Sequence, residues 1–228
     1  NQILQTERLA ATGRLAASIA HEINNPLQGI MTHLEIIRAQ LPQDLLEDES
    51  FEIVSDNVTK IKNIVRQLLE IYRSSHTGRQ LIHINDLVER VVNLISNQIR
   101  VKGAHLTLRF ADHLPPLLGW PQQIHQVILN ILLNALDAIS QEGKIVITTF
   151  LQGDDIVLKI TDNGSGIPSD RLDRIFDPFF STIKDAGVGL GLFVCQGLIK
   201  NHNGTINVTT RVKKGTEFVI TLPRYEEE

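Results

Sequence analysis

Several kinds of residue are scarce in this chain of 228 residues, and each scarcity excludes a class of protein. A single cysteine, Cys195, excludes an internal disulfide and any site built from several thiols, and it is typical of a reducing compartment. Acidic residues outnumber basic ones by 26 to 22, so no basic excess favours nucleic acid or an anionic membrane. No apolar run approaches the ~18 residues that span a bilayer, and the polar start does not resemble a signal peptide. We therefore expect a cytoplasmic location, with no nucleic acid partner and no membrane contact by this chain.

Length and composition indicate two folded domains. The 228 residues exceed one domain of ~100–150 residues. The 42% hydrophobic and 21% charged residues are ordinary for a globular protein. Because the first residue is Asn1 rather than methionine, we expect a fragment of a longer protein, whose own anchorage in a membrane stays open.

The first third of the chain has helical periodicity. Apolar residues recur at steps of three or four over residues 15–41 and again over 51–71, which places each set on one face of a helix. The break after residue 41 predicts two helices joined as an antiparallel hairpin. One hairpin cannot cover both apolar faces, so we expect a second copy to complete a dimeric four-helix bundle.

A polar stretch at residues 73–79 is typical of a linker and predicts domains over residues 1–76 and 80–228. After it we expect helices over residues 84–100, with Asn85 as N-cap, 121–140 and 187–201. We expect strands over residues 105–110, 144–151, 156–161, 205–211 and 216–222. Runs of strands with helices on one face indicate an α/β sandwich.

The group around His21 is the sharpest local feature. His21 lies off the apolar stripe of its helix and faces solvent, and Glu22 beside it can orient the imidazole for nucleophilic attack. Asn25, four residues on, lies above His21 on the same face. Pro26 should bend the helix just after this group. A solvated histidine beside an ordinary glutamate is the alternative interpretation.

Two glycine-rich loops follow downstream, at residues 162–167 and 187–192. Glycine lets the backbone approach a ligand closely, and a helix that begins after glycines is a natural phosphate site. Neither loop matches the Walker A pattern, and turns that merely need a positive φ are the alternative.

Three polar side chains, Asn130, Asn134 and Asp137, share one face of an otherwise apolar helix. A side-chain oxygen there can hold Mg²⁺ next to bound phosphates. The alternative is that these side chains cap a neighbouring loop.

Taken in order, these motifs resemble those of two-component sensor histidine kinases over nearly the whole chain. Residues 18–27 resemble the H box, 130–134 the N box, 162–167 the G1 box, 176–180 the F box and 187–192 the G2 box. Residues 215–216, Phe218 and residues 222–223 resemble the C-terminal end of the family. Five motifs in the family's order make the resemblance specific, although no single one would.

The resemblance implies a dimerisation and histidine-phosphotransfer hairpin followed by a Bergerat-type ATP-binding domain. His21 would take the γ-phosphate of ATP and pass it to an aspartate of a response regulator. Glu22 would orient the imidazole and accept its proton, and Asn25 would position a water that dephosphorylates the regulator. Asn134 and Asn130 would hold Mg²⁺.

Within the ATP-binding domain, the resemblance implies that Asp162 bonds the adenine amino group with Thr216 nearby. Residues 163–187 would form a lid over the nucleotide, packed by Phe176, Phe179 and Phe180. The implied nucleotide-binding residues are Asn130, Asn134, Asp137, Asp162, Gly164, Gly166, Ile167, Phe176, Phe179, Lys184, Gly187, Gly189, Leu190, Gly191, Leu192 and Thr216.

Two departures from the family's pattern stand out. Trp120 occupies the place before Pro121 where the family often has aspartate, which puts little of the chemistry in doubt. The lid is one residue longer before the G2 box, so Lys184 is as well explained by a solvated loop lysine as by a phosphate contact.

Three other functions stay open at this point. The chain can act mainly as a phosphatase of the regulator, or as a nucleotide-binding conformational module that transfers nothing. A Ser/Thr kinase of the same ATP-binding fold would not need the hairpin that carries His21. Histidines 33, 76, 83, 105, 113, 125 and 202 show no spacing typical of metal ligands, and Cys195 is expected to be a small core residue.

Overall fold

The computed structural model describes residues 26, 28–39, 53–54, 57–58, 78–178, 180 and 189–226. The chain divides into two compact units, Asn1–Ser75 and His76–Glu228, and each is considered by itself.

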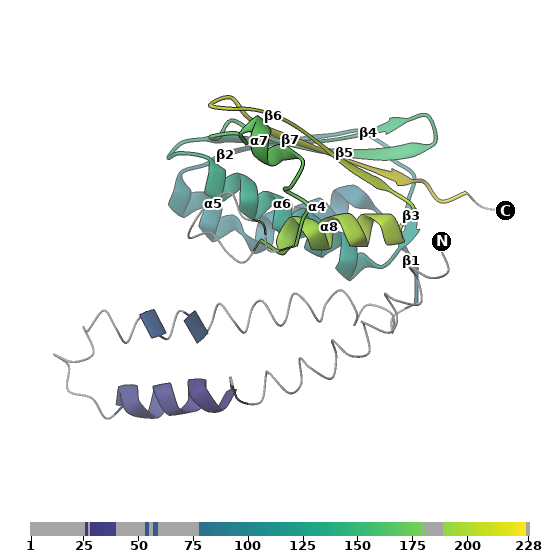
Figure 1. Cartoon of the computed structure of the whole chain (residues 1–228). Helices are drawn as coiled ribbons and strands as arrows, with labels where there is room; N and C mark the ends of the chain where they lie inside the picture. The colour runs from purple at the N-terminus through teal and green to yellow at the C-terminus, as the bar shows by residue number, and fades with distance from the viewer. Residues whose placement is uncertain are drawn as a thin grey trace. The chain divides into compact units, whose positions relative to one another are not determined.

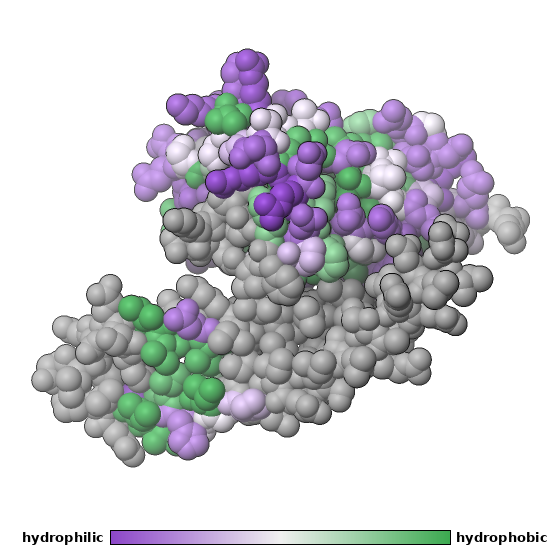
Figure 2. All heavy atoms as spheres, in the orientation of Figure 1, coloured by the Kyte–Doolittle hydropathy of each residue, from purple (hydrophilic) through white to green (hydrophobic). Residues whose placement is uncertain are grey.

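In the first unit, residues 28–39 form a helix. Two of its side chains contact the backbone one turn earlier: Thr32 Oγ1 donates to the Gln28 carbonyl at 3.0 Å, and His33 Nδ1 lies 2.8 Å from the Gly29 carbonyl oxygen. Two residues of its apolar face, Ile30 and Ile37, are each 46% exposed. Figure 2 shows this face as hydrophobic surface on the described part of the unit.

The second unit contains a five-stranded sheet in the order β2-β4-β5-β7-β6. Its strands are β2 (His105–Phe110), β4 (Lys144–Gln152), β5 (Asp155–Asp162), β6 (Thr205–Arg211) and β7 (Gly215–Pro223). Only the β2–β4 pair is parallel. A separate antiparallel pair joins β1 (Gln80–Ile82) to β3 (Leu117–Gly119).

Helices cover one face of the five-stranded sheet (Figure 1). They are α4 (Ile84–Leu94), α5 (Ser96–Lys102), α6 (Pro121–Ala138) and α8 (Gly191–Asn201), while α7 (Ser169–Leu172) is a single turn in the loop after β5. The predicted α/β sandwich is confirmed. Because α6 packs against α4, α8 and the sheet, its residues lie at the centre of the unit.

The core lies between α6 and the alternating inward residues of the sheet. Ile128 and Ile131 of α6 and Ile147 and Ile156 of the sheet are fully buried. Burial of each such side chain contributes roughly 1.5–3 kcal/mol relative to exposure. This rigid layer holds the loops at the ends of β5, α6 and β7, where the candidate site is built.

Two predicted details of α4 are wrong. Residues 84–100 do not form one helix, because the chain turns at the buried Ile95 and begins again as α5. Asn85 is not the N-cap, which is His83. The Asn85 side chain instead donates to the Ala111 carbonyl and accepts from the Thr149 hydroxyl at 2.7 Å, which ties α4 to the sheet.

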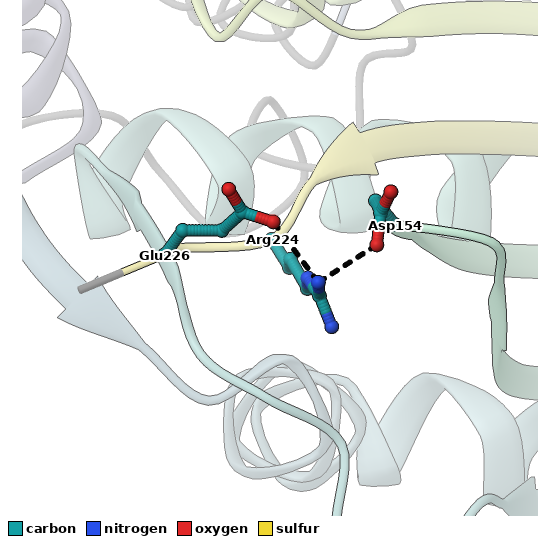
Figure 3. Close-up of polar contacts among 3 residues, drawn as sticks. All are labelled: Asp154, Arg224 and Glu226. Atoms are coloured by element: carbon teal, nitrogen blue, oxygen red, sulfur yellow. Dashed lines mark hydrogen bonds and ion pairs between the residues drawn. The ribbon is translucent and has the colours of Figure 1, made fainter. Parts of the chain in front are cut away.

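The C-terminal segment is fastened to the turn between β4 and β5. Arg224 Nη2 lies 2.7 Å from Asp154 Oδ1 and 2.9 Å from Glu226 Oε1 (Figure 3). The backbone adds to this, since Arg224 N donates to the Asp154 carbonyl and Tyr225 N to that of Pro116. The Arg224–Asp154 backbone bond continues the pairing of β7 with β5 past the end of β7.

Candidate functional site

The carboxylate of Asp162 is buried at the end of β5. Its Oδ1 accepts hydrogen bonds from the backbone N–H of Gly164 at 2.7 Å and of Thr216 at 3.3 Å. Burial raises the pKa of Asp162 above the ordinary carboxyl value, and the two N–H donors oppose that rise. Among the described residues, none donates a hydrogen bond to Oδ2. The carboxylate is thus held by one oxygen and can accept a ligand's N–H at the other.

A pair of threonine hydroxyls supports this carboxylate. Thr210 Oγ1 donates to the Gly215 carbonyl at 3.1 Å, accepts from Ile167 N at 2.9 Å and lies 3.2 Å from Thr216 Oγ1. Because the Thr210 hydrogen is used on Gly215, the Thr216 hydroxyl must be the donor between the two threonines. The lone pairs of Thr216 therefore stay available as acceptors beside Asp162.

The glycines of the loop after β5 are required by close backbone contacts. A Cβ on Gly164 would lie 2.5 Å from the Ala138 carbonyl oxygen, which also accepts from Ser165 N at 3.0 Å. A Cβ on Gly166, whose φ is +69°, would lie 2.3 Å from the Arg211 carbonyl oxygen. The loop is therefore packed between the end of α6 and the end of β6, and it is more than a turn that needs positive φ.

Asn130 joins α6 to α8. The side chain is 7% exposed; its Oδ1 accepts from Gln126 Nε2 at 3.1 Å. Its Nδ2 donates to the Gly191 carbonyl at 3.4 Å and to Cys195 Sγ at 3.7 Å. The Asn130 carboxamide is thus fixed next to the N-terminus of α8, the helix that follows the second glycine loop.

Asn134 and Asp137 lie farther along α6 and are exposed. Partial burial raises the pKa of the Asp137 carboxyl, and the positive charge of Lys102 opposes the rise. Asn130 is the buried one of the three, and it contacts Gly191 and Cys195 of α8. Amide and carboxylate oxygens therefore line the exposed end of the helix face that Asn130 begins.

At the end of the second glycine loop, the backbone of Gly189 lies close to the backbone of Phe180. Gly189 has a φ of +70°, and a Cβ there would lie 2.4 Å from the Phe180 carbonyl oxygen. Helix α8 begins at Gly191, whereas the sequence predicted a helix over residues 187–201. The described residues 189–190 are not part of the helix, because Gly189 has a left-handed backbone conformation that cannot continue it. Leu190 is buried as the residue before α8, and Leu192 is half-buried in its first turn.

Two family models match the chain. Residues 11–77 match the His Kinase A (phospho-acceptor) domain. Residues 119–226 match the histidine kinase-, DNA gyrase B-, and HSP90-like ATPase, the stretch that contains Asn130, Asp162 and both glycine loops. The chain belongs to the sensor histidine kinase family. The match to both models accounts for the division into two units.

Curated relatives are also sensor kinases. This histidine kinase is 34% identical over 98% of its length to the sensor histidine kinase ZraS of Escherichia coli strain K12, covering 48% of that protein. It is 37% identical over 97% of its length to the signal transduction histidine-protein kinase AtoS of the same strain, covering 36% of it. The chain therefore spans about half the length, or less, of the curated relatives it matches.

Solved histidine kinases have the same fold. Full-length ShkA in complex with AMPPNP superposes with a TM-score of 0.76 at 22% identity, over 92% of this chain and 46% of that one. The histidine kinase ThkA in complex with the response regulator protein TrrA gives a TM-score of 0.69 at 25% identity, over 96% of this chain and 64% of that one.

Several expected site residues of this kinase lie outside the described residues: His21, Glu22, Asn25, Phe179, Lys184 and Gly187. Of the expected lid, Phe176 and Phe180 are described, and both are half-buried. The guanidinium of Arg174 lies over the ring of Phe180 at 4.7 Å. The described ends of the loop at Phe180 and Gly189 are in contact, as the close approach above requires.

Sequence reasoning missed two residues that complete the site in this kinase. Thr210 was treated only as a strand residue, although its pairing with Thr216 across β6 and β7 brings its hydroxyl to the Asp162 loop. Gln126 is absent from the predicted site, although its spacing of four residues from Asn130 indicates that the two side chains share a helix face. Among the described residues, no group of three or more His, Cys, Asp or Glu side chains is placed to hold a metal ion, and no helix is long and apolar enough to cross a membrane.

Proposed function

We propose that this chain is the kinase core of a two-component system, which transfers the γ-phosphoryl group of ATP to His21 and then to an aspartate of a response regulator. The observation that carries the proposal is the buried Asp162 carboxylate, which is anchored through one oxygen by Gly164 and Thr216 and is open at the other. The match of residues 11–77 to a phospho-acceptor domain supplies the acceptor side.

The two regions divide the work. Residues 1–76 form the dimerisation and histidine-phosphotransfer hairpin, and residues 80–228 form the catalytic ATP-binding domain. The exposed Ile30 and Ile37 support a homodimer, because a second hairpin would remove both side chains from water.

Asp162 selects the base. Its Oδ2 accepts a hydrogen bond from the exocyclic amino group of adenine, and Thr216 offers a second acceptor beside it. Guanine carries a carbonyl oxygen at the corresponding position, which would face the carboxylate without a hydrogen. The unpaired buried acceptor makes guanine nucleotides poor ligands.

The polar face of α6 fits a magnesium ion. The side-chain oxygens of Asn134 and Asn130, with the Asp137 carboxylate nearby, are hard oxygen donors of the kind Mg²⁺ prefers, and Mg²⁺ takes its remaining ligands from phosphates and water. When bound, the ion neutralises charge on the phosphates. The remaining nucleotide contacts come from the glycine loops and from Leu190, Leu192, Ile167, Phe176, Phe179 and Lys184.

The chemistry at His21 is a single displacement. An imidazole nitrogen forms a P–N bond to the γ-phosphorus as the bond to the bridging oxygen of ADP breaks. Glu22 orients the ring and accepts its proton. Positioning supplies most of the rate, since His21 and the γ-phosphate must be held in line.

The second transfer requires a protein partner. ThkA has been solved with the response regulator protein TrrA, and we infer that this chain likewise docks a regulator at the hairpin, where phosphohistidine is the donor. Asn25 lies four residues after His21 and can position a water, so the same surface supports phosphatase activity toward the regulator.

The test is incubation of the chain with γ-labelled ATP and Mg²⁺. Label that is lost in acid, stable in alkali, absent from His21→Gln and present in the control His33→Gln supports the proposal. Loss of label from the kinase on addition of a receiver domain supports the second transfer. Absence of label on a folded dimer that binds ATP would leave phosphatase activity, tested with Asn25→Ala, as the function.

A further inference from the structure

The orientation of the Asn130 side chain is set by groups on α8. The Gly191 carbonyl oxygen can only accept a hydrogen bond, and it lies 3.4 Å from Nδ2 of Asn130. The Cys195 thiol uses its hydrogen on the Val127 carbonyl at 3.9 Å, so toward Asn130 its sulfur acts as an acceptor. Both neighbours on α8 therefore require the amide nitrogen, and the amide oxygen must point away from them.

The amide oxygen is met from the other side by Gln126. Nε2 of Gln126 donates to Oδ1 of Asn130 at 3.1 Å from one turn earlier in α6. With Gly191 and Cys195 on the nitrogen and Gln126 on the oxygen, every hydrogen-bonding group of this carboxamide is engaged in one orientation. A flip of the amide would place two acceptors against Oδ1 and two donors against each other.

We propose that Gln126 and Cys195 are positioning residues, which hold the Asn130 carboxamide with its oxygen presented as the ligand for the magnesium ion of the bound nucleotide. This inference rests on the proposed function, since it concerns the ion that accompanies ATP. A carbonyl oxygen has two lone pairs, so it can keep the bond from Gln126 and still coordinate a cation. Groups that hydrogen-bond a metal ligand in this way contribute about 10- to 100-fold to metal affinity.

Cys195 is suited to this role by its burial. The thiol is 0% exposed; it donates to the Val127 carbonyl at 3.9 Å and accepts from Asn130 Nδ2 at 3.7 Å. The same contacts explain why the sulfur of Cys195, on the buried side of α8, lies next to the polar Asn130 of α6.

The experiment compares ADP binding by calorimetry with Mg²⁺ and with EDTA, on the whole chain. Gln126→Met keeps the length of the side chain and removes the donor; Gln122→Met, one turn earlier and exposed, is the matched control. We expect Gln126→Met to weaken ADP binding roughly tenfold with Mg²⁺ and to leave binding in EDTA unchanged. Gln122→Met should match the wild type in both conditions.

A second pair of variants tests the sulfur. Cys195→Ala removes the acceptor and should reduce the gain in affinity from Mg²⁺. Cys195→Ser retains a donor and an acceptor and should restore most of it. Melting temperatures of all four variants report whether the fold is intact.

The outcomes distinguish the positioning roles of Gln126 and Cys195 from nucleotide binding itself. Equal Mg²⁺ dependence in Gln126→Met and Gln122→Met, with wild-type melting, overturns the positioning roles and leaves nucleotide binding standing. Equal weakening of Gln126→Met with Mg²⁺ and with EDTA also overturns them, because the loss would then be structural. Failure of the wild-type chain to bind ADP in either condition overturns the proposed function itself.

Discussion

The backbone N–H of Trp120 donates a 3.0 Å hydrogen bond to Nε2 of His202, a residue 82 positions away. Nδ1 of the same ring donates to the Leu198 carbonyl at 2.8 Å, so His202 is neutral with its hydrogen on Nδ1. The ring also meets the Trp120 indole edge to face, with centroids 5.4 Å apart. The imidazole thus joins the end of α8 to the start of α6, the two helices that carry the nucleotide motifs.

This relationship predicts a pH dependence. Burial, with the charge of Arg79 as a smaller cause, lowers the pKa of His202 below its ordinary 6.5, so the folded protein binds a proton less readily than the unfolded chain. The contribution to stability is complete above 6.5 and is lost as pH falls through the lower pKa of the folded state. Unfolding by urea at a series of pH values checks the sign.

Trp120 offers a direct readout, since it is the chain's single tryptophan. Protonation of Nε2 removes the acceptor for Trp120 N–H, so tryptophan emission should change with a midpoint below 6.5. The change should be absent from His202→Gln and present in His105→Gln, whose ring is exposed on β2. An identical titration in His202→Gln would contradict the assignment.

Asp162→Asn should separate stability from binding. The raised pKa of Asp162 means that its ionised form costs stability at neutral pH, and asparagine removes that cost while its oxygen still accepts from Gly164 and Thr216. The amide NH₂ must then face the ligand's amino group, donor against donor. We expect a melting temperature equal to or above that of the wild type, with ADP binding weakened roughly 10- to 100-fold.

The matched control for this variant is Asp155→Asn, at the other end of the same strand. It should leave ADP binding unchanged. Wild-type affinity in Asp162→Asn would remove Asp162 from the site.

Thr210→Val should destabilise the backbone segments that surround Asp162. Valine keeps the shape of the side chain but leaves Ile167 N and the Gly215 carbonyl without their partner, at a cost of about 1–3 kcal/mol in the free energy of unfolding. Thr209→Val, the adjacent exposed position on β6, should change that free energy by less than about 0.5 kcal/mol. Equal urea midpoints for the two variants would show that the hydroxyl of Thr210 is dispensable.

Two glycine substitutions should have opposite signs. Gly197 lies within α8 with nothing within 4 Å of an added Cβ, so Gly197→Ala should stabilise the protein by roughly 0.5–1 kcal/mol. Gly164→Ala would force a Cβ to 2.5 Å from the Ala138 carbonyl oxygen and should destabilise it by about 1–3 kcal/mol. Thermal melting checks both, and a destabilised Gly197→Ala would show that α8 does not tolerate the added methyl.

The sequence was sufficient where local pattern and burial agree. Strands β2 and β6 have the predicted bounds, because alternation of side chains along each strand matches its pairing. The glycine loops were found from the spacing of their glycines, and Asp162 was assigned its role from the resemblance to histidine kinases. Strands β1 and β3 were missed, since three residues are too few to show alternation and each is stabilised by the other.

What the sequence could not supply is the set of contacts between distant residues. Asn85 was predicted to cap α4, but Thr149 on β4 takes its side chain. Thr210 and Cys195 gained their roles only when β6 was paired with β7 and α8 was packed on α6. Asn85 and Thr149 are 64 residues apart in the chain, and no periodic pattern in the sequence indicates a contact over such a separation.

The central claim is that the nucleotide held at Asp162 supplies the phosphoryl group of His21. Mass spectrometric mapping of the chain after incubation with ATP and Mg²⁺, quenched in alkali, tests it most directly. The account predicts a single phosphoryl group on His21 in the wild type and much less in Asp162→Asn at an ATP concentration that does not saturate the variant. Phosphate on a serine, a threonine or another histidine, or equal phosphorylation of Asp162→Asn, would contradict it.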